Sequence, residues 1–216
     1  MMDIIVILIL VAAVVLAVAR LIYVLHSIHQ GLPLILSHHK TVKTLVVLGS
    51  GGHTVEMLKM VAALNPKKYN PRVYVVADTD KISNKKLLQV EEHFKGEGQF
   101  VVEVVPRTRE VGQSWVTSAF TTLHALVVSF VILVRHRPAL ILANGPGTCV
   151  PLCAGAVMLR VLGVTPSRVV FVESLCRVRS LSLSGRILYP ISDHFFVQWP
   201  QLTINHPRAH YNGRLV

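Results

Sequence analysis

The chain has 216 residues, of which 52% are hydrophobic and 15% are charged, and its 22 Lys and Arg against 11 Asp and Glu give a net charge of +11. This hydrophobicity excludes an intrinsically disordered chain, and the charged fraction is below the ~25% that is usual for soluble proteins. Three cysteines are too few, and odd in number, for a disulfide framework, so a reducing compartment is expected.

Residues 1–26 form a predicted membrane anchor. Ile4–Ala19 is an unbroken run of 16 apolar residues, and the apolar stretch resumes after Arg20 and reaches Leu25. As a helix, the segment from Ile4 to Leu25 spans about 33 Å, enough to cross the hydrocarbon core of a bilayer. The alternative is a cleaved signal peptide, but the first three residues contain no Lys or Arg and no small-residue cleavage site follows. We therefore expect a retained, single-pass anchor.

Charges on the two sides of this segment predict its orientation. Arg20, Lys40 and Lys43 lie at or beyond its C-terminal end, whereas Asp3 is the one charged side chain before it. The positive-inside rule then puts everything after residue 26 in the cytosol. Because Asp3 and Arg20 cancel, that cytosolic part carries the whole +11 and should contact anionic head groups or an anionic ligand. Nucleic acid is not expected as a partner, because the chain has no module signature and only 6% aromatic residues.

A juxtamembrane linker is predicted over residues 27–43, followed by one domain over 44–216 in which strands and helices alternate. Strands are expected at Thr44–Leu48, Arg72–Ala77, Phe100–Val105, Ala139–Ala143, Arg168–Val172 and His194–Gln198. Helices are expected at Thr54–Leu64, Lys81–Phe94, Ser114–Val134 and Thr148–Leu162. The alternation predicts an α/β fold with one parallel, Rossmann-like sheet, whose ligands bind at the carboxyl ends of the strands.

A glycine-rich loop follows the first of these strands. It consists of Gly49, Ser50, Gly51, Gly52, His53 and Thr54. Glycines let the backbone approach a ligand closely, and the N-terminus of the next helix offers free N–H groups, which together favour phosphate. The loop is not a dinucleotide fingerprint, because Thr54 stands where a third glycine is needed, and no Gly-Lys-Ser/Thr follows as in a Walker A loop. A tight turn without a ligand is the alternative.

A second loop of this kind follows the fourth predicted strand. It consists of Asn144, Gly145, Pro146, Gly147 and Thr148. Pro151 then falls in the first turn of the next helix, where proline is well tolerated. Two such helix N-termini at the same edge of a sheet could hold a diphosphate from two sides.

Three side chains near these loops could carry chemistry. His53 could act as a general base or donate a hydrogen bond to a substrate, or it could simply cap its helix. Glu56, three residues later, is expected to stabilise the first helical turn. Glu173 follows the fifth strand, where it could accept hydrogen bonds from sugar hydroxyls or form a salt bridge with Arg177 or Arg179.

Other polar clusters carry weaker signals. Arg107 and Arg109 follow the third strand and could face phosphate, lipid or solvent. Cys149 and Cys153 are four residues apart but lack two further ligands, so no metal site is predicted.

The loops and their order resemble one family: the membrane-anchor subunit of the UDP-GlcNAc:dolichol-pyrophosphate-GlcNAc N-acetylglucosaminyltransferase of asparagine-linked glycosylation. The matching stretches cover nearly the whole chain. They are Leu48–Met57, Val76–Asp80, Pro106–Val111, Phe120–His124, Asn144–Pro151, Val172–Val178 and Phe196–Pro200.

This resemblance implies a GT-B glycosyltransferase divided between two chains, with this chain as the anchored, acceptor-side N-terminal half. A cytosolic partner would supply the half that binds UDP-GlcNAc. The two loops would bind the diphosphate of GlcNAc-PP-dolichol, with His53 near the reacting hydroxyl and Glu173 near the acceptor sugar. The partner would dock at the C-terminus, formed by Gly213, Arg214, Leu215 and Val216.

The resemblance also implies inverting transfer without a metal or cofactor, a chain that is inactive alone, and an endoplasmic reticulum location with a lumenal N-terminus. Two alternatives stay open from the sequence. One is a non-catalytic adaptor that only recruits its partner to the membrane. The other is an exopolysaccharide transferase subunit that acts on an undecaprenyl-linked acceptor.

Overall fold

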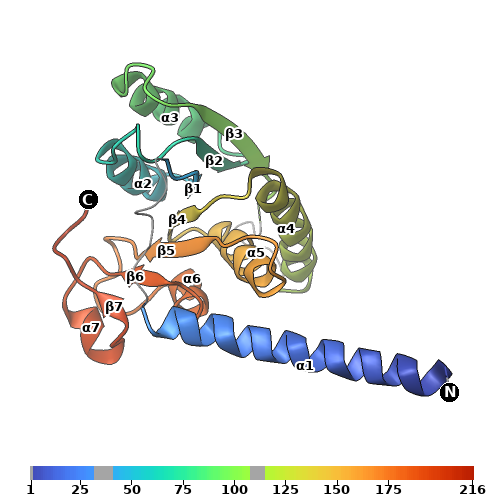
Figure 1. Cartoon of the computed structure of the whole chain (residues 1–216). Coiled ribbons are helices and arrows are strands. Elements are labelled where there is room, and N and C mark those ends of the chain that lie inside the picture. Colours follow the sequence, from blue (N-terminus) through green and yellow to red (C-terminus); the bar gives the residue numbers. More distant parts are fainter. Residues whose placement is uncertain (1, 32–40, 108–114) are drawn as a thin grey trace.

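Seven strands form one parallel sheet in the structure, a computed structural model that describes residues 2–31, 41–107 and 115–216 (Figure 1). The strands are β1 (Thr44–Val47), β2 (Arg72–Ala77), β3 (Phe100–Val105), β4 (Leu140–Asn144), β5 (Arg168–Val172), β6 (His194–Phe196) and β7 (Ala209–His210). Their order is β3-β2-β1-β4-β5-β6-β7, and every neighbouring pair is parallel. The carboxyl ends of β1, β4 and β5 therefore lie next to one another at one edge of the sheet.

Helices cover both faces of this sheet. They are α2 (Gly52–Ala62), α3 (Lys81–His93), α4 (Trp115–His136), α5 (Cys149–Val161), α6 (Leu183–Leu188) and α7 (Gln201–Asn205), after the N-terminal α1 (Met2–His29). Neighbouring residues of a strand point to opposite faces. Val46 accordingly packs with Met57 of α2 and Leu87 of α3. Val47 packs on the other face, in the cluster that contains Leu133 of α4 and Leu152 of α5.

The predicted α/β fold with a parallel sheet is confirmed by this topology. Strands β2, β3 and β5 have the predicted bounds, and the other elements predicted within the domain differ by one or two residues at one or both ends. Elements α6, α7 and β7 were not predicted, because they are too short to show a hydrophobic period.

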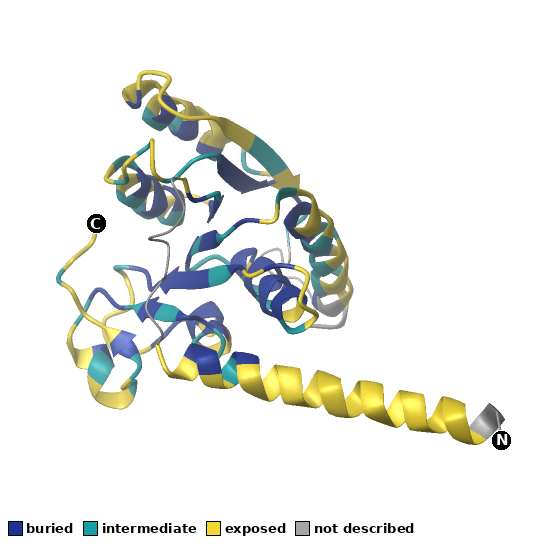
Figure 2. Ribbon diagram, viewed as in Figure 1, coloured by how far each residue is buried: buried dark blue, intermediate teal, exposed yellow. Residues whose placement is uncertain are grey.

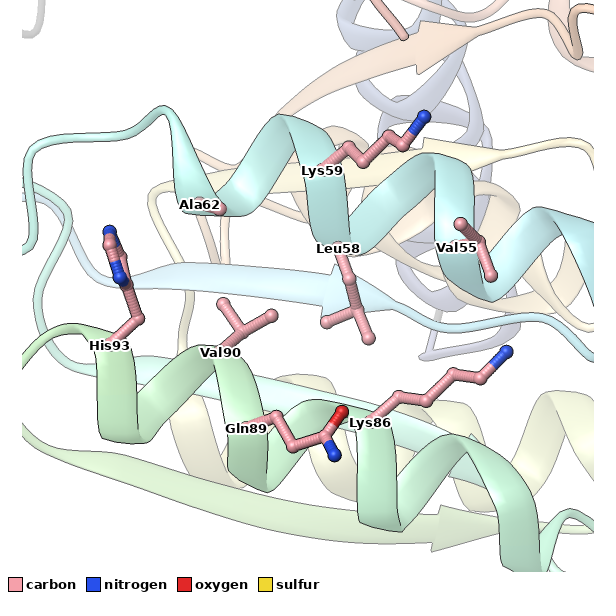
Figure 3. Close-up of a pocket in the computed structure, with 8 residues that line it drawn as sticks. All are labelled: Val55, Leu58, Lys59, Ala62, Lys86, Gln89, Val90 and His93. Carbon is pink, nitrogen blue, oxygen red and sulfur yellow. The ribbon is translucent and has the colours of Figure 1, made fainter.

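The parallel helices α2 and α3 leave an open groove of ≈ 550 Å³ between them (Figure 3). Leu58 and Val90 point toward one another across it, and Lys86 lies at its edge. The groove is on the face of the sheet opposite α4, and it contains none of the predicted site residues.

The N-terminal helix α1 projects from the domain and is exposed along most of its length (Figure 2). Residues 4–23 are all exposed, and the segment Ile4–His29 is long and apolar enough to cross a membrane by length and composition. Its last two turns differ, because Val24, Ser27 and Ile28 are buried against the domain. The helix therefore continues to His29, past the predicted end of the anchor at residue 26.

Two arginines hold the buried end of α1 in place. The Arg160 guanidinium of α5 donates to Ser27 Oγ at 2.7 Å and to Asp193 Oδ1 at 2.8 Å. Arg208 donates to the backbone oxygen of Ile28 at 3.4 Å and to that of Ser192 at 2.8 Å. These contacts join α1 rigidly to the C-terminal part of the sheet.

A buried ionic cluster lies between β2 and α3, near the sheet edge that is formed by β3. Arg72 of β2, only 1% exposed, donates from Nε and Nη2 to the two carboxylate oxygens of Glu91 in α3, each at 2.7 Å. Tyr74 donates to Glu91 Oε1 at 2.5 Å. Burial, together with the hydrogen bond and the negative charge of Glu91, raises the pKa of the Tyr74 phenol well above its ordinary value. The phenol thus stays protonated and able to donate.

The three cysteines should differ sharply in their reactivity toward a maleimide. Cys149 and Cys153 of α5 are fully buried, and burial raises the pKa of the Cys153 thiol to about 12. Cys176 is exposed. Because the thiolate is the reactive form, we expect mass spectrometry to find one adduct per native chain, at Cys176, and three adducts after denaturation. An adduct at Cys149 or Cys153 in the native chain would contradict this burial.

Candidate active site

The two glycine-rich loops come together at the carboxyl edge of the sheet. The first connects β1 to α2, and the second connects β4, the neighbour of β1, to α5. The loops are in direct contact: a Cβ atom at Gly49 would lie 2.9 Å from Pro146 Cγ and 2.8 Å from His53 Cβ. The two loops therefore lie next to each other, and a side chain at residue 49 would separate them. That they share one ligand site stays a prediction.

A chain of hydrogen bonds runs from His53 across three strand ends. His53 Nδ1 lies 3.0 Å from Asn144 Oδ1. The amide nitrogen of Asn144 donates to Glu56 Oε2 at 2.9 Å, and Ser174 Oγ donates to Glu56 Oε1 at 3.0 Å. His53 and Glu56 belong to α2, which follows β1, whereas Asn144 ends β4 and Ser174 follows β5. They fix the relative positions of these three segments.

The direction of these hydrogen bonds indicates which ring nitrogen of His53 carries a proton. An ionised Glu56 only accepts, so Asn144 must present its amide nitrogen to Glu56 and its oxygen to His53. Nδ1 of His53 must then carry the proton and donate. In a neutral imidazole this leaves Nε2 unprotonated. The arrangement thus provides a half-buried histidine whose second ring nitrogen, Nε2, can accept a proton.

Glu56 is the residue whose predicted role is wrong. It was expected at the third position of its helix, as a cap. Helix α2 instead begins at Gly52 with Gly51 as its N-cap, where φ is 62°. Thr54 therefore occupies the third position, and Glu56 occupies the fifth, where it is hydrogen-bonded to Asn144 and Ser174. The early start depends on a glycine that can adopt this backbone conformation.

Gly145 lies directly under the imidazole ring. Its φ is +54°, and a Cβ atom there would lie 2.6 Å from His53 Nδ1. Only a residue without a side chain lets the ring occupy this position.

The N-terminus of α2 is open toward the loops. The N–H groups of Gly52, His53 and Thr54 precede the first intrahelical hydrogen bond, so they are available to an anion. The Thr54 hydroxyl is not available, because it donates to Gly49 O at 2.5 Å beneath the loop. Ser83 Oγ also donates to Gly49 O, at 3.1 Å. Thr54 and Ser83 therefore support the loop from below.

The N-terminus of α5 is less open. The N–H groups of Cys149 and Val150 already donate to Pro146 O and Gly147 O, at 3.0 and 3.2 Å. Thr148 Oγ1 is buried and has no hydrogen-bond partner among the described residues. The two loops are thus unequal, with more free backbone donors at α2.

Glu173 is fully buried and does not form the salt bridge that was one of its two predicted roles. Its carboxylate accepts from the backbone N–H groups of Ser174 and Ser182, at 3.0 and 2.9 Å, and from Ser182 Oγ at 3.1 Å. Arg177 and Arg179 are exposed instead. Gly185 packs on the carboxylate so closely that a Cβ atom there would collide with Oε2. This geometry supports a positioning role for Glu173 in holding residues 173–182.

Replacing Glu173 with glutamine should therefore lower stability and activity together. The amide cannot accept from both backbone N–H groups, so we expect a loss of about 1–3 kcal/mol in the free energy of unfolding. Thermal unfolding and sugar transfer should be measured on the same preparation. A contact between Glu173 and the acceptor sugar would instead lower the rate with the unfolding temperature unchanged.

The C-terminal residues fold back onto the domain. Leu215 N–H donates to Gln198 Oε1 at 2.9 Å, and the guanidinium of Arg214 lies 4.5 Å from the centre of the Trp199 ring. Leu215 also lines an apolar hollow of ≈ 270 Å³ with Met57 of α2 and other residues of β4, β5 and β6. Gln198 Nε2 is buried and has no partner among the described residues. Arg107 and Arg109 were predicted to face phosphate, lipid or solvent. Arg107 is half-buried, and Arg109 lies outside the described residues.

Comparison with known proteins shows the family of this chain and agrees with its fold. Residues 44–215 match the family described as oligosaccharide biosynthesis protein Alg14 like. The mouse UDP-N-acetylglucosamine transferase subunit ALG14 is 46% identical over 190 residues, which cover 83% of this chain and 87% of the mouse protein. The protein of the same name from Yarrowia lipolytica is 43% identical over 206 residues, 95% of each chain.

Two solved structures share the fold. MurG of Acinetobacter baumannii matches with a TM-score of 0.56 and 14% identity, over 80% of this chain and 45% of MurG. A putative UDP-N-acetylglucosamine 2-epimerase from Listeria monocytogenes matches with a TM-score of 0.56 and 14% identity, over 78% of this chain and 42% of that chain. This chain therefore spans less than half of each protein, and its sheet resembles part of a GT-B glycosyltransferase. From the match over residues 44–215 and the identity to these relatives, we conclude that the chain belongs to the Alg14-like family of oligosaccharide biosynthesis proteins.

Proposed function

We propose that this chain is the membrane-anchored, acceptor-binding subunit of a two-chain N-acetylglucosaminyltransferase. The complex transfers GlcNAc from UDP-GlcNAc to GlcNAc-PP-dolichol at the cytosolic face of the endoplasmic reticulum. The chain is inactive alone, because it has a single sheet domain and the donor binds to a cytosolic partner subunit. Support comes from the names of its relatives, which are UDP-N-acetylglucosamine transferase subunits.

The observation that carries the proposal is the orientation of His53. Its ring is fixed through Asn144 and Glu56, so that Nε2 is free to accept a proton. The ring lies in the first turn of α2, next to the open N–H groups of that helix. A base and an anion-binding helix end thus lie side by side, as an acceptor with a hydroxyl near a diphosphate requires.

The proposed reaction is an inverting transfer. The diphosphate of the acceptor binds at the N-terminus of α2 and along residues 144–148. His53 Nε2 takes the proton from the 4-hydroxyl of the acceptor GlcNAc while that oxygen attacks the anomeric carbon of the donor sugar. The bond from that carbon to UDP breaks, and UDP leaves with the electron pair, stabilised by the partner subunit.

The C-terminal residues are the proposed docking site of the partner. The apolar hollow beside Leu215 supports this, because it leaves side chains of α2 and the sheet uncovered in the isolated chain. The orientation of α1, with a lumenal N-terminus, is supported by the basic residues that follow the apolar run.

The test is a transfer assay in membranes with labelled UDP-GlcNAc and GlcNAc-PP-dolichol. It compares this chain alone, the cytosolic partner alone, and both together. We expect product only with both. Product from this chain alone would overturn the division of the enzyme between two chains. Product from the partner alone would make this chain dispensable for catalysis.

The assay also separates two other functions. An adaptor without a catalytic role would keep full activity after replacement of His53. A subunit that acts on bacterial lipids would prefer an undecaprenyl-linked acceptor over the dolichol-linked one.

A further inference from the structure

The groove between α2 and α3 has the residue spacing of a surface on which another helix packs. From α2 it is lined by Val55, Leu58 and Ala62, which are three and then four residues apart. From α3 it is lined by Lys86 and Val90, again four residues apart. Side chains at this spacing share one face of a helix, and two such rows side by side form a groove that accepts a third helix.

Apolar surface in and beside the groove is uncovered. Leu58 and Val90 point toward one another at its floor, and both belong to the core cluster between these helices and the sheet (Figure 3). Val55 is 37% exposed. Ile82 lies one turn before Lys86 on the same face of α3 and is 66% exposed. Apolar side chains that continue a packed face into solvent in this way typically mark an interaction surface.

Two lysines without a counter-charge flank this apolar floor. Lys59 of α2 is exposed, and Lys86 of α3 is half-buried. Neither forms an ion pair among the residues that the structure describes, and none of the residues that line the groove is acidic. A half-buried ammonium group loses part of its hydration, so a carboxylate that binds beside it is stabilised. The charges therefore favour an acidic occupant.

The groove is separate from both the apolar helix α1 and the candidate active site. The buried end of α1 packs in the core cluster of α4 and α5, on the other face of the sheet. None of the residues of the two glycine-rich loops lines the groove. Its occupant can therefore bind without displacing either of them.

We propose that the groove between α2 and α3 is a docking site for an acidic amphipathic helix of another protein. The apolar side chains of that helix repeat every three to four residues and pack on Val55, Leu58 and Val90. Asp or Glu beside this apolar row pairs with Lys59 and Lys86. Seven residues separate Val55 from Ala62, so the contact is about 10 Å long, or about two turns of the docked helix.

The test is the binding of synthetic helical peptides to the full chain in nanodiscs of zwitterionic lipid, measured by fluorescence anisotropy. The acidic peptide has Leu at the a and d positions of its heptads and Glu at the e and g positions. The basic peptide, of the same length, has Lys in place of each Glu. Above the background of empty nanodiscs, we expect saturable binding of the acidic peptide and about tenfold weaker binding of the basic one at low salt.

Variants of the chain locate the binding. Replacing both lysines, Lys59→Glu together with Lys86→Glu, should weaken binding of the acidic peptide by about tenfold or more, because two attractions become repulsions. Lys85→Glu is the matched control, since Lys85 is exposed on α3 and does not line the groove. Val55→Gln should also weaken binding, although it leaves the charge unchanged.

Three results would overturn the proposal. The first is the absence of saturable binding of the acidic peptide. The second is equal binding to the unchanged chain and to the double lysine variant. The third is an equal loss in the Lys85→Glu control, because the peptide would then respond to net charge and not to the groove.

Discussion

Replacing His53 with alanine should lower the rate of sugar transfer by about 10²–10⁴-fold, the usual contribution of a general base. The variant should still bind its partner and keep its unfolding temperature, because the side chain of His53 makes one hydrogen bond among the described residues, to Asn144, at the edge of the network. The measurement is initial rate at saturating donor and acceptor, together with co-purification of the partner. A variant with near-normal turnover would show that the base lies elsewhere.

Replacing Gly145 with alanine should have a comparable effect without removing the histidine. The new Cβ atom would lie 2.6 Å from His53 Nδ1, so the ring must move, and a displacement of about 1 Å can cost about 100-fold in rate. Gly96→Ala is the matched control. Gly96 also has a positive φ, of +77°, but nothing lies within 4 Å of the position of its Cβ atom. The control carries the same backbone strain and should keep its activity, so equal losses in both variants would contradict the role of the ring position.

Replacing Glu91 with alanine should cause the largest loss of stability, about 3–5 kcal/mol in the free energy of unfolding. The change leaves the guanidinium of Arg72 buried without its counter-charge and the Tyr74 hydroxyl without an acceptor. Backbone oxygens of Pro66, Tyr69 and Glu97 also accept from Arg72, but they carry no full charge. The measurement is thermal or urea unfolding of the chain in detergent.

Glu92→Ala is the control for this prediction. Glu92 is the next residue of α3 and is exposed, so its replacement should change stability by no more than about 0.5 kcal/mol. A similar loss in both variants would show that the buried ion pair is not the cause, and no loss at Glu91 would contradict the burial of the Arg72 charge.

The fold could be predicted from the sequence because its elements carry local signals. A strand such as Arg72–Ala77 is a short apolar run that is buried on both faces, and its bounds follow from composition alone. Helix α6 has six residues and no hydrophobic period, and its start depends on the hydroxyl of Ser182, which accepts from Gly185 N–H. Such a short element is stabilised by its contacts with the rest of the domain.

The site could be predicted in part. Glycines and a histidine in a loop after a strand indicate a ligand, and this led to residues 49–54 and 144–148. The role of Glu56 was missed, because its partners Asn144 and Ser174 are 88 and 118 residues away in the sequence. A local sequence pattern cannot reveal contacts between residues that are so far apart in the chain. The signal that was available is a carboxylate on the helix face one turn after His53, pointing toward the same strand ends.

The last two turns of α1 belong to the core of the domain, so this helix is connected rigidly to the domain and not through a flexible linker. Val24 and Ile28 are each 1% exposed, and Ser27 is held by Arg160. Any tilt or rotation of α1 in a bilayer must turn the whole domain with it. The entrance of the site would then stay at one fixed distance from the bilayer surface. That distance would select the length of the acceptor head group. An acceptor whose head group is one sugar longer would carry its terminal hydroxyl past His53.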